Sequence, residues 1–314
     1  MNPNILLGGS MQNTFRYTGG NGDISPKITK GLPLFLSPRY INFTQPVNFP
    51  STGEKIIVWT NQSFNAQAPT ISVFDRLVMN TAGIDNPTWR LFDNQTGRFL
   101  SNWGVPTPLM FGTAGRPYIL PEPIIMDANS DVQATANPVF QTGAKNRYPY
   151  FHGRQFYYDN AKRNRLLERK RYISPFLLLP EADVTLTSGQ TLKYTVKIAQ
   201  GHFRALQLQL YGDLAFTVRI TDVLRRQEIS NTAIVHGGAS ANPELIGRYP
   251  RWLACPYLLP QGSTLTFELT NLGAADNQIG VALAGQMLYC PLREVQTMLR
   301  DLAKPFTLDV GVAD

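Results

Sequence analysis

Thr88-Trp89-Arg90-Leu91-Phe92-Asp93 gives the first clue to the architecture, because a second version, Thr217-Val218-Arg219-Ile220-Thr221-Asp222, follows about 130 residues later. Seven positions after each Asp comes a similar triplet, Leu100-Ser101-Asn102 in the first block and Ile229-Ser230-Asn231 in the second. Small changes in the offset fit insertions in surface loops. The repeat therefore predicts two copies of one domain and not a solenoid of short units. Further matches in the same order are His152-Gly153-Arg154 with Ala284-Gly285-Gln286, and Pro123-Ile124-Ile125 with Pro256-Tyr257-Leu258.

Both halves consist of short runs of β-branched and aromatic residues bounded by Gly, Pro, Asn and Asp, which is typical of β-strands. In residues 191–198 the apolar side chains alternate with polar ones, as on a strand with one buried face. Leu206, Leu208 and Leu210 alternate in the same way and are expected to share a face. The sequence predicts an all-β protein with two tandem β-sandwich domains of the jelly-roll kind.

The pattern along the chain predicts five segments. Residues 291–302 begin with Pro and carry apolar residues at helical spacing, so a short C-terminal helix is expected there. Residues 1–36 are rich in Gly, Asn and Pro and cannot bury enough surface to fold alone. The predicted segments are an N-terminal arm (1–36), a first sandwich (37–159), a basic linker (160–172), a second sandwich (173–290) and a C-terminal helix and tail (291–314).

Composition limits the possible partners. Of the 314 residues, 43% are hydrophobic and only 16% are charged, which is the composition of a folded chain with a weakly charged surface. Either neighbouring subunits cover part of that surface, or polar Asn, Thr and Gln side chains fill it. The net charge of +7 favours polyanionic surroundings, such as nucleic acid or an acidic membrane surface. No secretory signal and no apolar run long enough for a membrane helix are recognisable.

The sequence lacks the usual motifs of catalysis and of cofactor or metal binding. Its three histidines, His152, His202 and His236, are far apart, and we expect His202 and His236 to be surface or loop residues. No metal, cofactor or catalytic residue is therefore predicted, and an enzyme is the least supported class. The two cysteines, Cys255 and Cys290, are expected to be buried free thiols, with a disulfide between adjacent strands as the alternative.

A basic segment lies between the two copies. Because charge at this density contacts phosphates without reading sequence, these residues are candidates for contact with a polyanion. The alternative is a solvated linker whose Leu166 and Leu167 pack back onto a domain. The candidate residues are Lys162, Arg163, Arg165, Arg169, Lys170 and Arg171.

Two pairs of residues mark the repeated turn. Asp93 and Asp222 occupy equivalent positions, where an Asp side chain commonly bonds the backbone amides of its own turn. Arg90 and Arg219 precede the same turn and are expected to pair with the Asp or to bond backbone. All four residues are predicted to have a structural role.

Residues 256–272, which lead to residues 281–289, are similar to the end of sandwich domains in phage capsid-associated proteins. From about residue 39 to 290 the arrangement resembles the double jelly-roll coat proteins of tailless bacteriophages. The resemblance implies a non-enzymatic virion protein that forms homo-oligomers, contacts other virion proteins and has no small-molecule substrate. It also implies a basic side that faces packaged nucleic acid or an inner viral membrane. Residues 1–36 and 291–314 would be ends that fold during assembly.

Two other functions stay open at this stage. The chain is also compatible with a head–tail connector, tail or baseplate component built from the same sandwich. A carbohydrate- or receptor-binding module is the third possibility, in which exposed Trp103 or Trp252 would contact the glycan. The symmetry of the assembly separates the first two functions, and glycan binding identifies the third.

Overall fold

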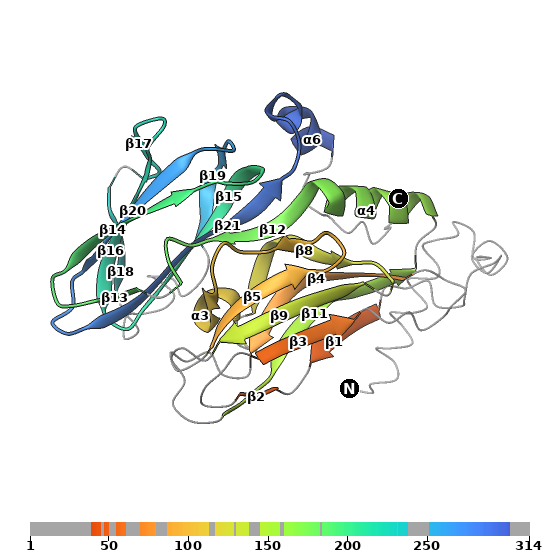
Figure 1. Cartoon of the computed structure of the whole chain (residues 1–314), viewed down its shortest axis with the longest axis horizontal. Coiled ribbons are helices and arrows are strands. Elements are labelled where there is room, and N and C mark those ends of the chain that lie inside the picture. The colour runs from red at the N-terminus through yellow and green to blue at the C-terminus, as the bar shows by residue number, and fades with distance from the viewer. Residues whose placement is uncertain are drawn as a thin grey trace, which may run out of the picture.

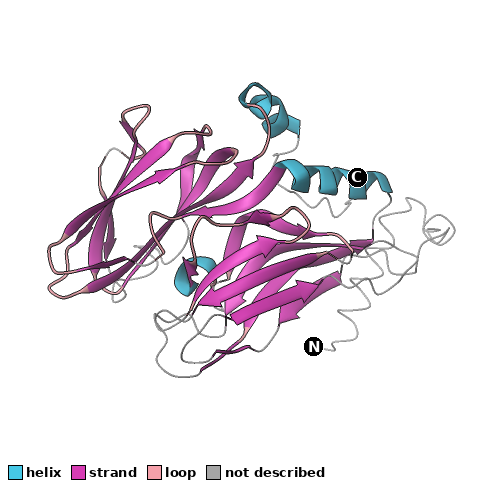
Figure 2. Ribbon diagram, viewed as in Figure 1, coloured by secondary structure: helices cyan, strands magenta, loops and turns pink. Residues whose placement is uncertain are grey.

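The structure is a computed structural model. It describes residues 39–44, 47–49, 55–60, 70–79, 87–112, 117–128, 130–137, 145–157, 160–182, 184–230, 232–237 and 251–301. Strands dominate this part of the chain, and the few helices are short (Figure 2). The predicted all-β class is therefore confirmed. The predicted arm at residues 1–36 lies outside the described residues.

The first half forms two main antiparallel sheets, with strand orders β1-β11-β4-β8 and β3-β9-β5-β6, and β7 also pairs with β5. A small third sheet joins β2 and β10. The elements of this half are β1 (Arg39–Thr44), β2 (Val47–Phe49), β3 (Lys55–Thr60), β4 (Thr70–Met79), β5 (Thr88–Asp93), β6 (Arg98–Phe99), β7 (Val105–Pro106), α3 (Thr107–Met110), β8 (Tyr118–Met126), β9 (Asp131–Asn137), β10 (Lys145–Arg147), β11 (Pro149–Tyr157) and α4 (Asn160–Tyr172).

The second half repeats this arrangement, with the sheets β12-β21-β15-β19 and β14-β20-β16-β17, while β13 and β18 pair with β21 and β16. Its elements are β12 (Ile173–Leu178), β13 (Val184–Leu186), β14 (Thr191–Lys197), β15 (His202–Gly212), β16 (Ala215–Asp222), β17 (Gln227–Glu228), β18 (Ile234–Gly237), β19 (Arg251–Leu259), β20 (Thr264–Asn271), β21 (Asn277–Leu288), η1 (Leu292–Glu294) and α6 (Val295–Asp301).

Each half is a jelly roll. The two four-stranded orders given above for each half contain eight strands. If these eight are numbered along the chain, one sheet has the order 1-8-3-6 and the other 2-7-4-5 in both halves. The two halves lie side by side, with α4 along the first and α6 over the second (Figure 1). The sequence repeat is therefore a repeat of structure.

A β-bulge opposite a glycine fixes the alignment of the two halves. Gly153 pairs with Phe74, and the register shift leaves Asp75 as the extra residue of β4. Gly285 pairs with Ala205 in the same way, and Leu206 is the extra residue of β15. A Cβ atom at either glycine would collide with a backbone carbonyl of the neighbouring strand. The bulge also corrects one prediction, because Ala205, Leu208 and Leu210 lie in the core of the second jelly roll whereas Leu206 does not.

The helices that follow the two jelly rolls occupy equivalent places. Leu166 of α4 packs on Ile125 of β8, and Val295 and Met298 of α6 cluster with Leu258 of β19. Ile125 and Leu258 are equivalent in the repeat, because each faces the residue before the bulge pair, Val73 or Arg204. The predicted C-terminal helix is confirmed, and α6 packs on the second jelly roll.

One apolar core crosses the boundary between the jelly rolls. It contains most of the buried side chains of the first jelly roll together with Leu177, Leu179, Tyr211, Ala282 and Ala284 of the second. A separate core fills the second jelly roll. No helix in the described ranges is both long and apolar enough to cross a membrane.

Candidate functional site: the junction and the exposed sheets

The segment predicted as a basic linker is helix α4, which suits its helix-forming residues and its lack of Gly and Pro. Leu166, Arg169 and Lys170 lie on one face of this helix and are buried. Arg169 and Lys170 are therefore not part of a polyanion-binding surface, and the prediction is wrong for these two residues. Arg171 is exposed, and Lys162, Arg163 and Arg165 lie in the helix, with side chains outside the described part of the structure.

Arg169 belongs to a buried polar network that joins α4 to both jelly rolls. Its Nε and Nη2 atoms donate to the two carboxylate oxygens of Glu122 in β8, each at 2.8 Å. Gln286 of β21 donates to the same carboxylate at 2.8 Å, and Arg204 donates to Gln286 at 3.1 Å. Glu122 is only 1% exposed, so the paired charges and the extra donor offset the cost of burying it. The carboxylate of Glu122 thus bonds side chains of α4 and β21 at the same time and connects β8 to both elements.

Sequence reasoning missed this network, although a signal for Glu122 exists. Glu122 is the one charged residue of β8, between Pro121 and Pro123 in a strand that is otherwise apolar or small. An isolated acid in such a strand indicates a buried carboxylate that needs a cation. Its partners, Arg169 and Gln286, are distant in sequence, and no local pattern connects them.

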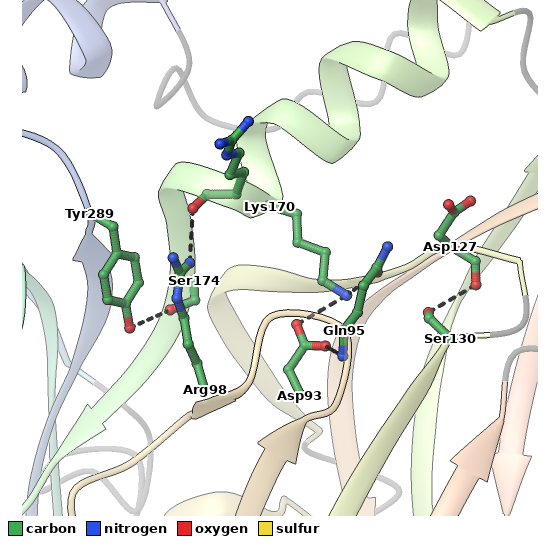
Figure 3. A network of polar contacts seen from close by, with 9 residues as sticks. Asp93, Gln95, Arg98, Asp127, Ser130, Lys170, Ser174 and Tyr289 are labelled. Atoms are coloured by element: carbon green, nitrogen blue, oxygen red, sulfur yellow. Dashed lines mark hydrogen bonds and ion pairs between the residues drawn. The ribbon is translucent and has the colours of Figure 1, made fainter.

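Lys170 forms the second buried ion pair of α4. Its Nζ lies 3.0 Å from Oδ2 of Asp93 and donates to Gln95 at 2.8 Å (Figure 3). Burial lowers the pKa of Lys170, and the carboxylate of Asp93 opposes this shift. The helix is thereby bonded to the repeated turn of the first jelly roll.

Asp93 and Asp222 each accept a hydrogen bond from the backbone of the repeated turn. The backbone N–H of Gln95 donates to Asp93 at 3.1 Å, and that of Leu224 donates to Asp222 at 3.0 Å. Each donor lies two residues after its Asp, so both carboxylates cap the same turn.

Arg90 and Arg219 do not pair with the Asp residues of the turn. The guanidinium of Arg90 lies 3.7 Å from the ring centroid of Phe99, in a cation–π contact. Arg219 lies 3.6 Å from Glu228 in an exposed ion pair. Arg90 and Arg219 are equivalent in the repeat, but they make different contacts with the neighbouring strand, one with an aromatic ring and one with a carboxylate.

A backbone contact completes the junction. The N–H of Leu177 in β12 donates to the carbonyl of Leu100 at 2.9 Å, and the side-chain amide of Asn102 bonds both the N–H and the carbonyl of Leu179. Close by, Arg98 donates to the carbonyl of Arg171 at 2.9 Å and lies 3.6 Å from the ring centroid of Tyr289 (Figure 3). The Leu100–Asn102 segment of the first jelly roll thus pairs with the edge strand of the second.

The outward faces of the two equivalent sheets differ in chemistry. In the first jelly roll one row across the sheet consists of Val58, Gln133, Phe92 and Phe99, according to the strand registers. The equivalent row of the second jelly roll consists of Thr195, Thr266, Thr221 and Glu228. Val58 and Phe99 are 45% and 41% exposed. This row of the first face is therefore partly apolar, whereas the equivalent row of its copy is polar.

The histidines and cysteines differ from the predictions in their burial. His202 and His236 are buried in strands, where His202 accepts a bond from the Gln261 N–H and His236 stacks on Phe216. Both cysteines are free, but Cys255 is exposed and Cys290 is half-buried. Within the described ranges no three His, Cys, Asp or Glu side chains come together as a metal site would require.

Comparison with known proteins gives structural likenesses only. No family model and no curated protein matches the sequence. A chain of Sulfolobus turreted icosahedral virus is 9% identical with a TM-score of 0.41, over 84% of this chain and 97% of that one. PNGase F, a glycosylasparaginase from Flavobacterium meningosepticum, is 11% identical with a TM-score of 0.33, over 80% and 96%. VP2 of infectious bursal disease virus is 11% identical with a TM-score of 0.24, over 80% and 72%.

These matches include both virus particles and an enzyme. One general arrangement of sheets can carry unrelated functions, because function depends on sites and surfaces. At these scores and identities the likenesses do not identify the function of this chain.

Proposed function

We propose that this chain is a non-enzymatic structural protein of a bacteriophage virion, which assembles with copies of itself into or onto the capsid shell. The observation that carries the proposal is the locked pair of equivalent jelly rolls. A shared core, the hydrogen bond from Gln286 to Glu122 and a backbone contact hold the two units in one arrangement, and two buried ion pairs fix the connecting helix α4 on the first jelly roll. A rigid block with two similar flanks suits repeated contacts between copies, because identical subunits assemble through symmetric surfaces.

The asymmetric sheet faces support this proposal. A polar face such as that of Thr195 and Thr221 is suited to water, whereas the row with Val58 and Phe99 gains free energy when a neighbouring copy covers it. Val58→Lys should therefore weaken self-assembly by about tenfold without lowering the melting temperature. Thr195→Lys, at the equivalent position of the second jelly roll, is the matched control and should assemble normally. Equal assembly of the two variants would argue against burial of this face.

Polyanion contact is kept as part of the proposal for the outer residues of α4. Lys162, Arg163, Arg165 and Arg171 would face packaged nucleic acid or an inner viral membrane, where cations are favoured without sequence specificity. The four-fold replacement of these residues by Gln should flatten the salt dependence of binding to single-stranded DNA. Unchanged binding would remove this role and leave the shell role in place.

The decisive experiment is the mass of the purified chain in solution, combined with negative-stain imaging. We expect closed symmetric assemblies, and a stable monomer at high micromolar concentration would overturn the proposal. Rings with six-fold or twelve-fold symmetry would instead identify a head–tail connector, and elongated assemblies a tail or baseplate component.

One observation favours a second candidate, a carbohydrate-binding module. Trp103 is 45% exposed, and a solvent-facing indole is a common platform for sugar rings. A glycan array with hits that Trp103→Ala abolishes would support this function. Trp252, the other predicted glycan contact, has a side chain outside the described part of the structure.

A further inference from the structure

The contact between the two jelly rolls adds a short segment of one to the edge of a sheet in the other. We call the added segment the donor segment and the strand edge that receives it the acceptor edge, whichever of them donates a given hydrogen bond. The donor segment is Leu100–Asn102, which follows β6 of the first jelly roll. The acceptor is the outer edge of β12, where Ser101 and Leu177 form a parallel bridge. The Leu177 N–H donates to the Leu100 carbonyl at 2.9 Å, and the Leu177 carbonyl accepts from the Asn102 N–H at 3.4 Å. Both polar backbone groups of Leu177 therefore point away from its own sheet.

The donor segment is repeated in the second jelly roll. Ile229 and Ser230 follow β17 as Leu100 and Ser101 follow β6, and their local bonds agree. The Leu100 N–H donates to Leu91 and the Ile229 N–H to Ile220, both at 2.9 Å. Each serine hydroxyl donates to the carbonyl two residues later, at 2.7 Å for Ser101 and 2.6 Å for Ser230. The second jelly roll thus carries a donor segment of the same local structure, and the described part of the chain holds no third jelly roll to which it could bind.

The acceptor edge is repeated in the first jelly roll. β1 pairs with β11 as β12 pairs with β21, and the glycines of the bulges, Gly153 and Gly285, set the register. Gly153 faces Ile41 and Gly285 faces Phe176, so the next residues, Asn42 and Leu177, are equivalent. In the described ranges only β11 pairs with β1, so no described strand covers its other edge at Asn42. An open strand edge is a template for pairing with another chain.

We propose that the β1 edge at Asn42 is bound by the Ile229–Ser230 segment of a second copy of this chain. The contact repeats between chains the one that Leu100–Asn102 makes with β12 inside the chain. It is heterologous, because each chain contributes one donor segment and one acceptor edge, so successive copies join head to tail and form a closed ring where the rotation allows it. The inference rests on the proposed self-assembly and names a second surface that takes part in it, besides the row with Val58 and Phe99.

Site-directed cross-linking tests the contact directly. Ser101 and Leu177 are bridge partners, so cysteines at the equivalent Ser230 and Asn42 of two chains would lie within disulfide distance. In a background with Cys255→Ser and Cys290→Ser, the Ser230→Cys and Asn42→Cys chains are oxidised separately and as a mixture. We expect a covalent dimer only in the mixture, and longer covalent species from the doubly substituted chain. Lys193→Cys mixed with Asn42→Cys is the control, since Lys193 is exposed on another surface of the second jelly roll, and this mixture should stay monomeric on a non-reducing gel.

Proline substitution tests the same contact without cysteines. Asn42→Pro removes the N–H that the contact needs, and we expect self-assembly to weaken about tenfold or more. Tyr40→Pro is the matched control, because Tyr40 is equivalent to Pro175 of β12, where proline is already accommodated and where the contact uses no N–H. Both variants should keep the melting temperature of the parent within a few degrees.

The outcomes separate the two proposals. Assemblies that form without the cross-link, or equally in Asn42→Pro and Tyr40→Pro, would overturn this contact and leave the structural function standing. A chain that neither assembles nor cross-links would overturn both. The cross-link in the mixture together with the loss caused by Asn42→Pro would establish the contact.

Discussion

Asp93 and Asp222 occupy the same place in the repeat, yet their second carboxylate oxygens have different partners. Oδ2 of Asp93 faces the ammonium of Lys170 at 3.0 Å, whereas Oδ2 of Asp222 accepts from the Tyr257 hydroxyl at 3.1 Å. The turn itself was predictable, because an Asp at this position bonds its own backbone. The burial of Lys170 was not, since a basic run is normally solvated and its acidic partner lies 77 positions earlier in the sequence.

Lys170→Met tests the importance of this pair for stability. The variant leaves Asp93 buried without its cation, and we expect the free energy of unfolding to fall by about 3 kcal/mol. Adding Asp93→Asn should recover part of this loss, because the amide keeps an oxygen for the Gln95 N–H without a buried charge. Tyr257→Phe removes the hydroxyl that donates to Asp222 in the second jelly roll and should cost less, about 1.5 kcal/mol, because Arg225 still lies 3.5 Å from the same carboxylate oxygen. Chemical denaturation measures all three, and equal losses for Lys170→Met and Tyr257→Phe would contradict a special role of the ion pair.

At the scale of elements, the alternation in residues 191–198 predicted the inward face of a strand correctly, whereas a bulge changes the alternation in β15. Leu206, Leu208 and Leu210 follow a simple period of two, but the extra residue in β15 moves Leu206 out of the core. The alternation of apolar residues does not reveal the bulge, because the bulge forms opposite a glycine in a strand about 80 positions away in the sequence. Helix α4 was not predicted either. Its buried face includes Arg169 and Lys170, so the sequence shows no apolar stripe that would mark this face.

The two glycines opposite the bulges give a matched pair of variants. Gly153→Ala and Gly285→Ala each place a Cβ against a backbone carbonyl that cannot move without breaking the sheet, so each should destabilise the protein by about 3 kcal/mol or more. Gly189→Ala is the control, because this glycine has a positive φ but open space around it, and its loss should be about 1 kcal/mol. Thermal unfolding distinguishes the two cases. A Gly153→Ala protein as stable as the Gly189→Ala protein would show that the bulge adapts.

At the scale of the whole molecule, the repeat in the sequence predicted two like domains, and the strand orders agree with it. The junction between them was not predictable, because it joins Glu122, Arg169 and Gln286 from three separate segments. The repeat does not contain this network either, since the position equivalent to Glu122 is occupied by the exposed Cys255. The two copies therefore have the same strand arrangement, but only the first has the side chains of the network that joins the two jelly rolls.

The continuous core and the Glu122 network predict that the two jelly rolls unfold together. Calorimetry of the intact chain should show one main transition, because loss of the first jelly roll would expose Leu177, Leu179 and Ala284 of the second. Glu122→Gln leaves Arg169 buried beside a neutral amide, so the first jelly roll should lose about 3 kcal/mol and melt earlier than the second, which has its own core. Cys255→Ala is the matched control at the equivalent exposed position and should unfold as the parent does. Two separate transitions in the parent, or an unchanged single transition in Glu122→Gln, would show that the network does not couple the domains.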